Sequence, residues 1–329
     1  LTDAIGQLID VGDLYNQLLY IFAEEAGKKI NNVLAPTEVV SLITKLIDGN
    51  RKNACLCDPA SGSGTLLIEV GKKMGIRGTD IYGQEVNWNL YALTKMNLML
   101  NGFKGATFLW GDSLRSPKLL DHGGLKKFDI VVSVPPFADK WASEEAYDDF
   151  YRRFKYGIPP KSQVTWAYIS HILASLRNDG QAVVVVPVGV LFRNTESKIR
   201  EQIIEYNLLE AVIELPSNLF HGTAISTAIL VFRKERMRTQ TLFVDARKGY
   251  ISNKGLYKLS DKVLEQLPNI YKKFLIGEEV GGEKNGCPVY VATQDEIRHN
   301  KYDLKVIKYV EDKIERKEID VKDALRKID

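Results

Sequence analysis

The chain has 329 residues, of which 45% are hydrophobic, and it can bury the core of one large domain or of one domain with an appendage. Its formal net charge of +3 is compatible with nucleic-acid binding but does not indicate it. The longest apolar runs, such as Ala182–Val186, have the length of a strand, which excludes a membrane span. Nothing resembles a signal peptide, so we expect a cytoplasmic protein.

The three cysteines predict no metal site. Cys55 and Cys57 lie two residues apart in a predicted strand, where their side chains point to the same face. Because no second cysteine pair and no suitably spaced histidine completes a zinc site, we expect no bound metal. We expect reduced cysteines packed in the core of a cytosolic protein.

Residues 1–50 predict a helical lead-in segment. Apolar residues recur at roughly helical spacing from Asp13 to Phe22, and Gly27 breaks the pattern. A second helix opens at Pro36, whose missing N–H costs nothing in a first turn.

From Asn53 onward, short apolar strands alternate with longer helical patterns, which is typical of a doubly wound, mostly parallel α/β sheet. We place this domain at residues 51–250. The last two strands are joined by Leu215–Ile225 without a helix, which favours one antiparallel strand at the end of the sheet. The predicted strands are Ala54–Pro59, Gly78–Glu85, Ala106–Gly111, Phe128–Val134, Gln181–Val190, Leu208–Glu214 and Ser226–Arg233.

After about Asp245 the pattern weakens, and residues 251–329 predict a helical C-terminal extension. A helix is expected around Ser260–Phe274, followed by the glycine- and charge-rich link Gly277–Gly286. The chain closes with Tyr309–Ile328, a highly charged helix of mixed sign. Two interpretations of this helix stay open: a solvated surface helix, and a helix that docks on a partner.

The strongest motif is the loop Asp58-Pro59-Ala60-Ser61-Gly62-Ser63-Gly64-Thr65, between a strand and a helical pattern. Glycine allows positive φ and close approach of a ligand to the backbone, and amides at a helix N-terminus can meet a carboxylate. The third glycine of the dinucleotide fingerprint is replaced by Leu67, which argues against a nicotinamide dehydrogenase. Two glycines behind an acid are more typical of an S-adenosylmethionine site, with a structural turn as the alternative.

Two further acids support a cofactor site. Glu85 ends the second strand, where it can accept both ribose hydroxyls, and Asp112 ends the third, where it can accept from the adenine amino group while Leu114 packs on the ring. Either acid alone could be a helix cap, but three acids at the ends of adjacent strands predict cofactor binding. The predicted cofactor-binding residues are Asp58, Ala60, Ser61, Gly62, Gly64, Thr65, Glu85, Asp112, Ser113 and Leu114.

The fourth strand runs directly into Val134-Pro135-Pro136-Phe137, which we predict to be the catalytic segment. It resembles the N-P-P-[FYW] motif of amino-group DNA methyltransferases. In that family the first side chain and a proline carbonyl accept from the amine of a flipped adenine, and the aromatic residue stacks on the base. In this chain Val134 replaces the Asn or Asp of the motif, which gives VPPF in place of NPPF. The segment therefore lacks one of the two hydrogen-bond acceptors for the target amine.

Other segments are similar to the modification (M) subunit of type I restriction–modification systems, an N6-adenine DNA methyltransferase. The resemblance implies a Rossmann-like class I fold, S-adenosyl-L-methionine as cofactor, and methyl transfer to a flipped adenine. At Val33-Leu34-Ala35-Pro36 only the proline of the family's F-x-T-P element remains. The matching stretches are Asp13–Lys29, Asn97–Gly102, Tyr156–Ser162, Leu215–Phe220 and Tyr302–Val310.

No separate target-recognition domain is visible, so the resemblance implies a specificity (S) subunit as partner on DNA, with a restriction (R) subunit in the full complex. The basic residues Arg152, Arg153, Lys155 and Lys161 follow the catalytic segment and could hold phosphates, with ordinary loop charge as the alternative. Two functions stay open: an active adenine-N6 methyltransferase subunit, and a catalytically silent scaffold that binds DNA or a partner.

Overall fold

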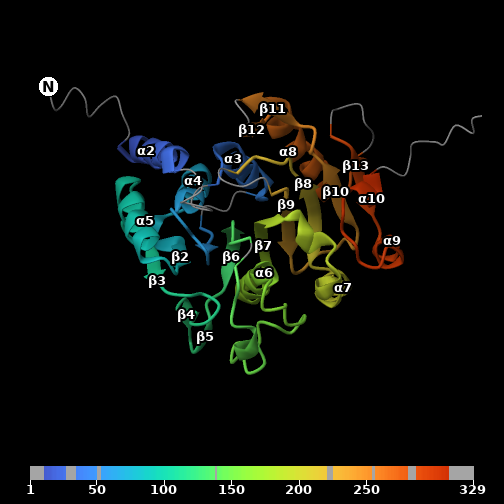
Figure 1. Ribbon diagram of the computed structural model, residues 1–329, viewed down its shortest axis with the longest axis horizontal. Coiled ribbons are helices and arrows are strands. Elements are labelled where there is room, and N and C mark those ends of the chain that lie inside the picture. Colours follow the sequence, from blue (N-terminus) through green and yellow to red (C-terminus); the bar gives the residue numbers. More distant parts are fainter. Residues whose placement is uncertain are drawn as a thin grey trace, which may run out of the picture.

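Figure 1 shows the computed structural model, which describes residues 11–26, 35–49, 53–137, 139–220, 225–253, 256–280 and 287–310. A nine-stranded sheet crosses the molecule in the order β13-β10-β8-β9-β7-β6-β1-β2-β3. Its strands are β1 Leu56–Asp58, β2 Ile81–Glu85, β3 Thr107–Trp110, β6 Phe128–Ser133, β7 Leu176–Pro187, β8 Leu209–Glu214, β9 Thr227–Arg233, β10 Thr241–Asp245 and β13 Val289–Ala292.

The sheet is mostly parallel, as predicted, but its antiparallel part differs from the prediction. Strand β9 runs antiparallel to both β7 and β8 and lies between them, inside the sheet rather than at its end. Because no helix is present in the described residues between β8 and β9, β9 can return directly beside β8 and fill the place next to β7. A second antiparallel strand, β13, pairs with β10 at the edge.

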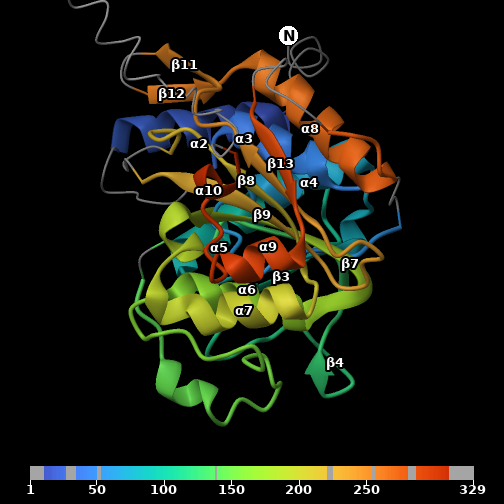
Figure 2. The same cartoon turned by 90° about the vertical axis from the view of Figure 1, so that its right-hand side faces the viewer.

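Helices cover both faces of the sheet, which explains why its central strands contain apolar residues that point to both faces (Figure 2). In β7, Val183 and Val185 pack toward α3, α4 and α8, whereas Val184 and Val186 pack toward α6, α7 and α9. The α-helices are α2 Val11–Ala26, α3 Thr37–Leu46, α4 Thr65–Met74, α5 Trp88–Leu100, α6 Val164–Ser175, α7 Ser197–Glu205, α8 Asp261–Ile276, α9 Gln294–His299 and α10 Ile307–Val310. The 3₁₀ helices are η2 Gly78–Asp80, η3 Ser143–Ala146, η4 Val188–Leu191 and η5 Asn194–Glu196.

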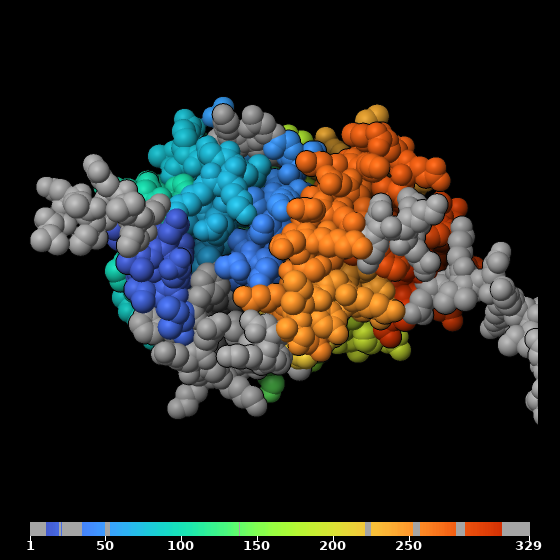
Figure 3. Space-filling model, turned by 90° about the horizontal axis from the view of Figure 1, so that it is seen from above, coloured from blue at the N-terminus to red at the C-terminus, as the bar shows by residue number. Residues whose placement is uncertain are grey.

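The C-terminal extension is not purely helical, and it shares the core of the sheet. Strand β13 belongs to the sheet, and α8 buries Leu267 and Phe274 in the same cluster as α3 and α4. Figure 3 shows these orange residues directly beside the blue N-terminal ones, and Lys45 Nζ donates to the Leu264 carbonyl at 3.0 Å. The predicted boundary at residue 250 therefore lies within one packed unit. Two small hairpins complete the fold: β4 Leu120–Asp121 with β5 Gly124–Leu125, and β11 Tyr250–Asn253 with β12 Leu256–Leu259.

Other predictions have mixed outcomes. Cys55 and Cys57 contact the same hydrophobic cluster, as expected for side chains on one face of a strand. Of the predicted helix Tyr309–Ile328, only Tyr309 and Val310 lie within the described residues. In the described part of the chain, no helix combines the length and the apolar character needed to cross a membrane.

Glu196, at the end of η5, is a fully buried carboxyl group whose oxygens accept no hydrogen bond from the described residues. Burial raises its pKa from 4.5 to about 7, against the opposing charges of Arg193 and Arg200. The folded state therefore holds this proton more tightly than the unfolded state, and stability falls as pH rises through this window. We expect Glu196→Gln to raise Tm by roughly 2–6 °C at pH 8 and by less at pH 5 in calorimetry. An equal rise in Tm at pH 5 and at pH 8 would contradict this explanation.

Candidate active site

The loop of residues 58–65, which we call the cofactor loop, joins β1 to the first turn of α4. Gly62 and Gly64 have φ values of 53° and 74°, which favour glycine. Thr94 Oγ1 donates to the Gly62 carbonyl at 2.7 Å, and Asn97 Nδ2 donates to the Ser63 carbonyl at 3.2 Å. Helix α5 therefore fixes the backbone conformation of the cofactor loop. Sequence reasoning missed both of these roles, although Asn97 lies in a stretch that resembles the family.

Gly64 has a second reason to be glycine, because a Cβ there would lie 2.4 Å from Thr94 Cγ2. We expect Gly64→Ala to lower the free energy of unfolding by about 2–4 kcal/mol through strain and overpacking, measured in urea. Adding Thr94→Ser removes Cγ2 but keeps the hydroxyl. The free energy of unfolding of the double variant should therefore lie within about 1 kcal/mol of the wild-type value, because only the backbone strain at residue 64 remains. Thr94→Ser alone is the control. A double variant no more stable than Gly64→Ala would contradict the steric explanation.

Glu85 lies at the end of β2 and is buried beside the cofactor loop. Its Oε2 accepts from the Gly62 amide at 2.8 Å, and its Oε1 accepts from the Asn87 amide at 2.7 Å. Burial raises the pKa of Glu85, although both amides oppose the shift. Each oxygen keeps a lone pair, so the carboxylate can still accept from two ribose hydroxyls.

Asp112 follows β3 and lies at the start of a turn, not of the helix that the capping alternative required. Its Oδ1 accepts from the amides of Leu114 and Arg115 at 2.8 and 3.1 Å and so stabilises this turn, while its contact with the cofactor stays a prediction. It also lines the large cavity described below, together with the buried Leu114. Ser113 Oγ donates to the Pro59 carbonyl at 2.6 Å and so ties this turn to the cofactor loop.

Asp58, the first residue of the cofactor loop, links the ends of two neighbouring strands. It is only 2% exposed, and its Oδ1 accepts from the Ala60 amide at 2.9 Å and from Ser133 Oγ at 2.8 Å. Burial raises its pKa to about 7, against these two hydrogen bonds. Ser133 ends β6, directly before the catalytic segment, and was not predicted as a site residue. The pairing therefore places the catalytic segment next to the cofactor loop.

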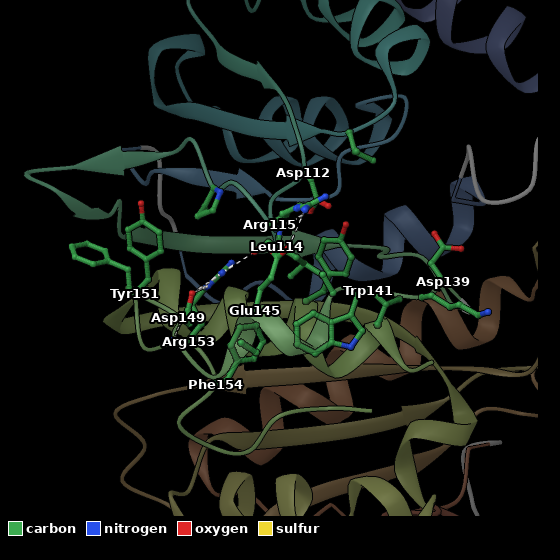
Figure 4. A pocket seen from close by; sticks show the side chains of 18 of the residues that line it. Asp112, Leu114, Arg115, Asp139, Trp141, Glu145, Asp149, Tyr151, Arg153 and Phe154 are labelled. Atoms are coloured by element: carbon green, nitrogen blue, oxygen red, sulfur yellow. Dashed lines mark hydrogen bonds and ion pairs between the residues drawn. The ribbon is translucent and has the colours of Figure 1, made fainter. Parts of the chain in front are cut away.

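Two cavities lie along this edge of the sheet. The larger, of about 400 Å³, is within the usual range for small-molecule sites and extends from Asp112 and Leu114 to Pro136 (Figure 4). Its opposite wall comes from the loop after the catalytic segment and includes Trp141 and Phe154, whose ring centroids are 5.1 Å apart. The smaller, of about 30 Å³, is lined by the cofactor loop and by Ala35, Val134, Phe137 and Phe220.

The catalytic segment runs along both cavities. Val134 is partly buried and faces the smaller one, whereas Pro136 lines the larger one and Pro135 is buried. The Phe137 ring is buried and meets the Phe220 ring edge to face at 5.5 Å between centroids. A base stacked on Phe137 would need the two rings to separate, so base stacking stays a prediction. Phe220 was not predicted as a site residue.

The four predicted basic residues do not form one surface. Arg153 is buried and paired with Asp149 at 2.7 Å, which removes it from the predicted phosphate contacts. A charge this deep is stable because carbonyls and a carboxylate surround it. Lys161 is exposed and contacts Glu144 at 2.9 Å, while Arg152 and Lys155 are exposed.

This geometry fits S-adenosyl-L-methionine. Glu85 offers acceptors for a ribose, and Asp112 and Leu114 border a cavity that suits an adenine. Asp58 faces the smaller cavity, which at about 30 Å³ has room for little more than one water molecule and would have to widen to hold a cationic methionine end. At the eroded F-x-T-P position, Ala35 lines the smaller cavity, while Val33 and Leu34 lie outside the described residues.

Comparison with known proteins decides the family. The sequence profile described as N-6 DNA Methylase matches residues 8–318. The chain belongs to the N-6 DNA methylase family. Its relatives include the type I restriction enzyme MpnII methylase subunit of Mycoplasma pneumoniae, 32% identical over 97% of this chain, and the MjaVIII methylase subunit of Methanocaldococcus jannaschii, 33% identical over 94%. The chain spans 60% and 55% of the lengths of these two relatives.

Solved structures agree with this assignment. The methyltransferase subunit of a type I restriction–modification system from Streptococcus thermophilus superposes with a TM-score of 0.81 at 29% identity, covering 92% of this chain and 66% of that one. This member of the N-6 DNA methylase family therefore has the predicted Rossmann-like class I fold, with S-adenosyl-L-methionine as the cofactor. The individual contacts to the cofactor remain predictions from the geometry above.

Proposed function

We propose that this chain is the methyl-transferring part of a type I modification subunit and that it methylates the N6 atom of adenine in DNA. The observation that carries the proposal is that Asp112 and Pro136 line the same cavity. One wall of this cavity therefore contains predicted cofactor residues, and the predicted catalytic segment lies beside them. This is the arrangement that transfer from a bound cofactor to a flipped base requires.

In the proposed reaction, S-adenosyl-L-methionine would supply a methyl group made electrophilic by its sulfonium. The sulfur–methyl bond would break as the N6 lone pair bonds to the methyl carbon, the sulfur would keep the bonding electrons, and N6 would then release one proton to water. Glu85 and Asp112 hold the ribose and adenine, so that the methyl group is directed toward the catalytic segment. The Pro135 carbonyl accepts a hydrogen bond from the target amine and orients its lone pair. Val134 adds no second acceptor, so orientation depends on the backbone and on the walls of the cavity.

The partners are also proposals. Base-specific readout requires side chains presented to a groove of the duplex, and we assign this to a specificity subunit on DNA in the cytoplasm, with a restriction subunit in the full complex. Arg152, Lys155 and Lys161 would contact phosphates near the flipped base, which makes binding weaken with salt. Residues 311–329, the charged C-terminal end, would dock on the specificity subunit.

Two observations favour the alternative of a silent scaffold. Val134 faces the smaller cavity with an apolar side chain, and the ring that should stack on the base is buried against Phe220. A scaffold would bind DNA or its partner without transferring a methyl group.

The test is transfer of a labelled methyl group from S-adenosyl-L-methionine to DNA in the presence of a cognate specificity subunit. We expect N6-methyladenine by nucleoside mass spectrometry, at a low rate. Cofactor binding without transfer, in both the wild type and Val134→Asn, would favour the scaffold. Absence of cofactor binding in calorimetry would contradict the cofactor site itself.

A further inference from the structure

Arg153 lies in the loop of residues 139–156, which follows the catalytic segment and forms one wall of the large cavity. We infer that Arg153 is a positioning residue that couples the adenine end of the cofactor site to this loop. The inference rests on the proposed function, because it concerns the cofactor and the surface that faces DNA.

The Arg153 guanidinium joins two segments that are distant in sequence. Its Nη1 donates to the Ser113 carbonyl at 3.0 Å, and its Nη2 donates to the Leu114 carbonyl at 2.7 Å. Within its own loop, Nε and Nη2 donate to Asp149 Oδ1 at 2.9 and 2.7 Å (Figure 4). A planar fork with fixed donor directions satisfies all of these acceptors together, which a lysine cannot do.

We call the contacts of Arg153 with Ser113, Leu114 and Asp149 the clamp, and helix α6 packs against it. His171 is buried, and its Nδ1 lies 3.3 Å from Arg153 Nη1. Burial, and then the charge of Arg153, lower the pKa of His171 to about 3, so the ring is neutral and adds no repulsion at pH 7. With Arg153 itself only 5% exposed, the clamp is part of the interior and has little freedom to move independently of the two segments.

The two segments that Arg153 joins border different surfaces of the molecule. At one end, Ser113 and Leu114 continue from Asp112, and Leu114 packs against Tyr168 in the cluster that borders the cavity. At the other end, the loop exposes Tyr147 by 79% and Phe150 by 80%, and Phe150 lines the cavity mouth. Exposed aromatic rings at the edge of this cavity are suited to stacking on unpaired bases of DNA.

The consequence is a coupling between cofactor and DNA. An adenine seated on Leu114 fixes the 112–114 turn, and through Arg153 this fixes the loop that carries Tyr147 and Phe150. Binding of the cofactor would then prepare the DNA-facing surface, and by reciprocity DNA would tighten cofactor binding. If Arg153 only stabilised the fold, cofactor binding would not change the loop.

The experiment measures amide hydrogen exchange across residues 143–154 with no ligand, with adenosine, with methionine and with S-adenosyl-L-methionine. In the wild type, adenosine and the full cofactor should slow exchange at least about 5-fold, and methionine should not. In Arg153→Lys this protection should be lost, and adenosine affinity in calorimetry should fall about 10-fold.

Arg200→Lys is the matched control, because Arg200 is 2% exposed and also donates to backbone carbonyls, of Tyr302, Val190 and Arg193, yet lines neither cavity. It should lose stability in urea but keep the adenosine-induced protection. Full protection in Arg153→Lys, or equal loss in Arg200→Lys, would overturn the coupling and leave the proposed function intact. A wild type that binds neither adenosine nor the cofactor would overturn both.

Discussion

The Val134→Asn variant should methylate DNA about 100–1000-fold faster than the wild type, because one preorganised acceptor at the reacting nitrogen contributes a factor of this size. Val134 lies directly after β6 and faces the smaller cavity beside the cofactor loop. An amide oxygen at this position can accept from the target amine while the Pro135 carbonyl accepts from the other hydrogen. The measurement is single-turnover transfer of labelled methyl with a specificity subunit supplied.

Val134→Leu is the control for this variant, since leucine matches asparagine in size and has no acceptor. It should leave the rate at or below that of the wild type, and both variants should bind the cofactor as the wild type does. An equal gain in the leucine variant would assign the effect to packing. A slow Val134→Asn variant with normal cofactor binding would show that the missing acceptor does not limit the rate.

Much of the sheet could be predicted because its strands are short apolar runs separated by helical patterns. All seven predicted strands are present, and Asp58 and Glu85 lie at strand ends as expected. The misses have physical causes. Strand β10 is short and follows a polar stretch, and β13 comes after α8, so neither has a local pattern that shows which neighbour it pairs with. The position of β9 between β7 and β8 is likewise a matter of topology, although its fully apolar run indicates burial on both faces.

The sequence places the motif residues of the candidate site at strand ends, but it does not show contacts between distant segments. Arg153 was predicted to contact phosphates, with ordinary loop charge as the alternative, and its burial contradicts both interpretations. Its partner Asp149 lies only four residues earlier, and this spacing was an available signal. The packing of Phe137 on Phe220 and the contact of Ser133 with Asp58 join segments that no local pattern connects.

The Glu85→Gln variant should bind S-adenosyl-L-methionine at least about 100-fold more weakly, because charge-assisted hydrogen bonds contribute about 1.5–3 kcal/mol each. Glutamine keeps one acceptor oxygen, but its amide group then opposes either the Gly62 or the Asn87 amide, which donate to the two carboxylate oxygens. The loss would therefore combine a missing ribose contact with a disturbed cofactor loop. Calorimetric titration measures the affinity, and Glu69→Gln, the same charge change on α4, is the control.

The pH dependence separates these two contributions. Because burial raises the pKa of Glu85, wild-type affinity should fall as pH is lowered toward that pKa, where the carboxylate gains a proton and loses acceptor capacity. The glutamine variant lacks this carboxylate and keeps Asp58, whose pKa of about 7 contributes the same change to both proteins. Its affinity should therefore change less than that of the wild type over the same range, and the two curves should converge at low pH. Parallel curves would mean that the cofactor does not depend on the charge of Glu85, and the weaker binding would then come from the disturbed loop alone.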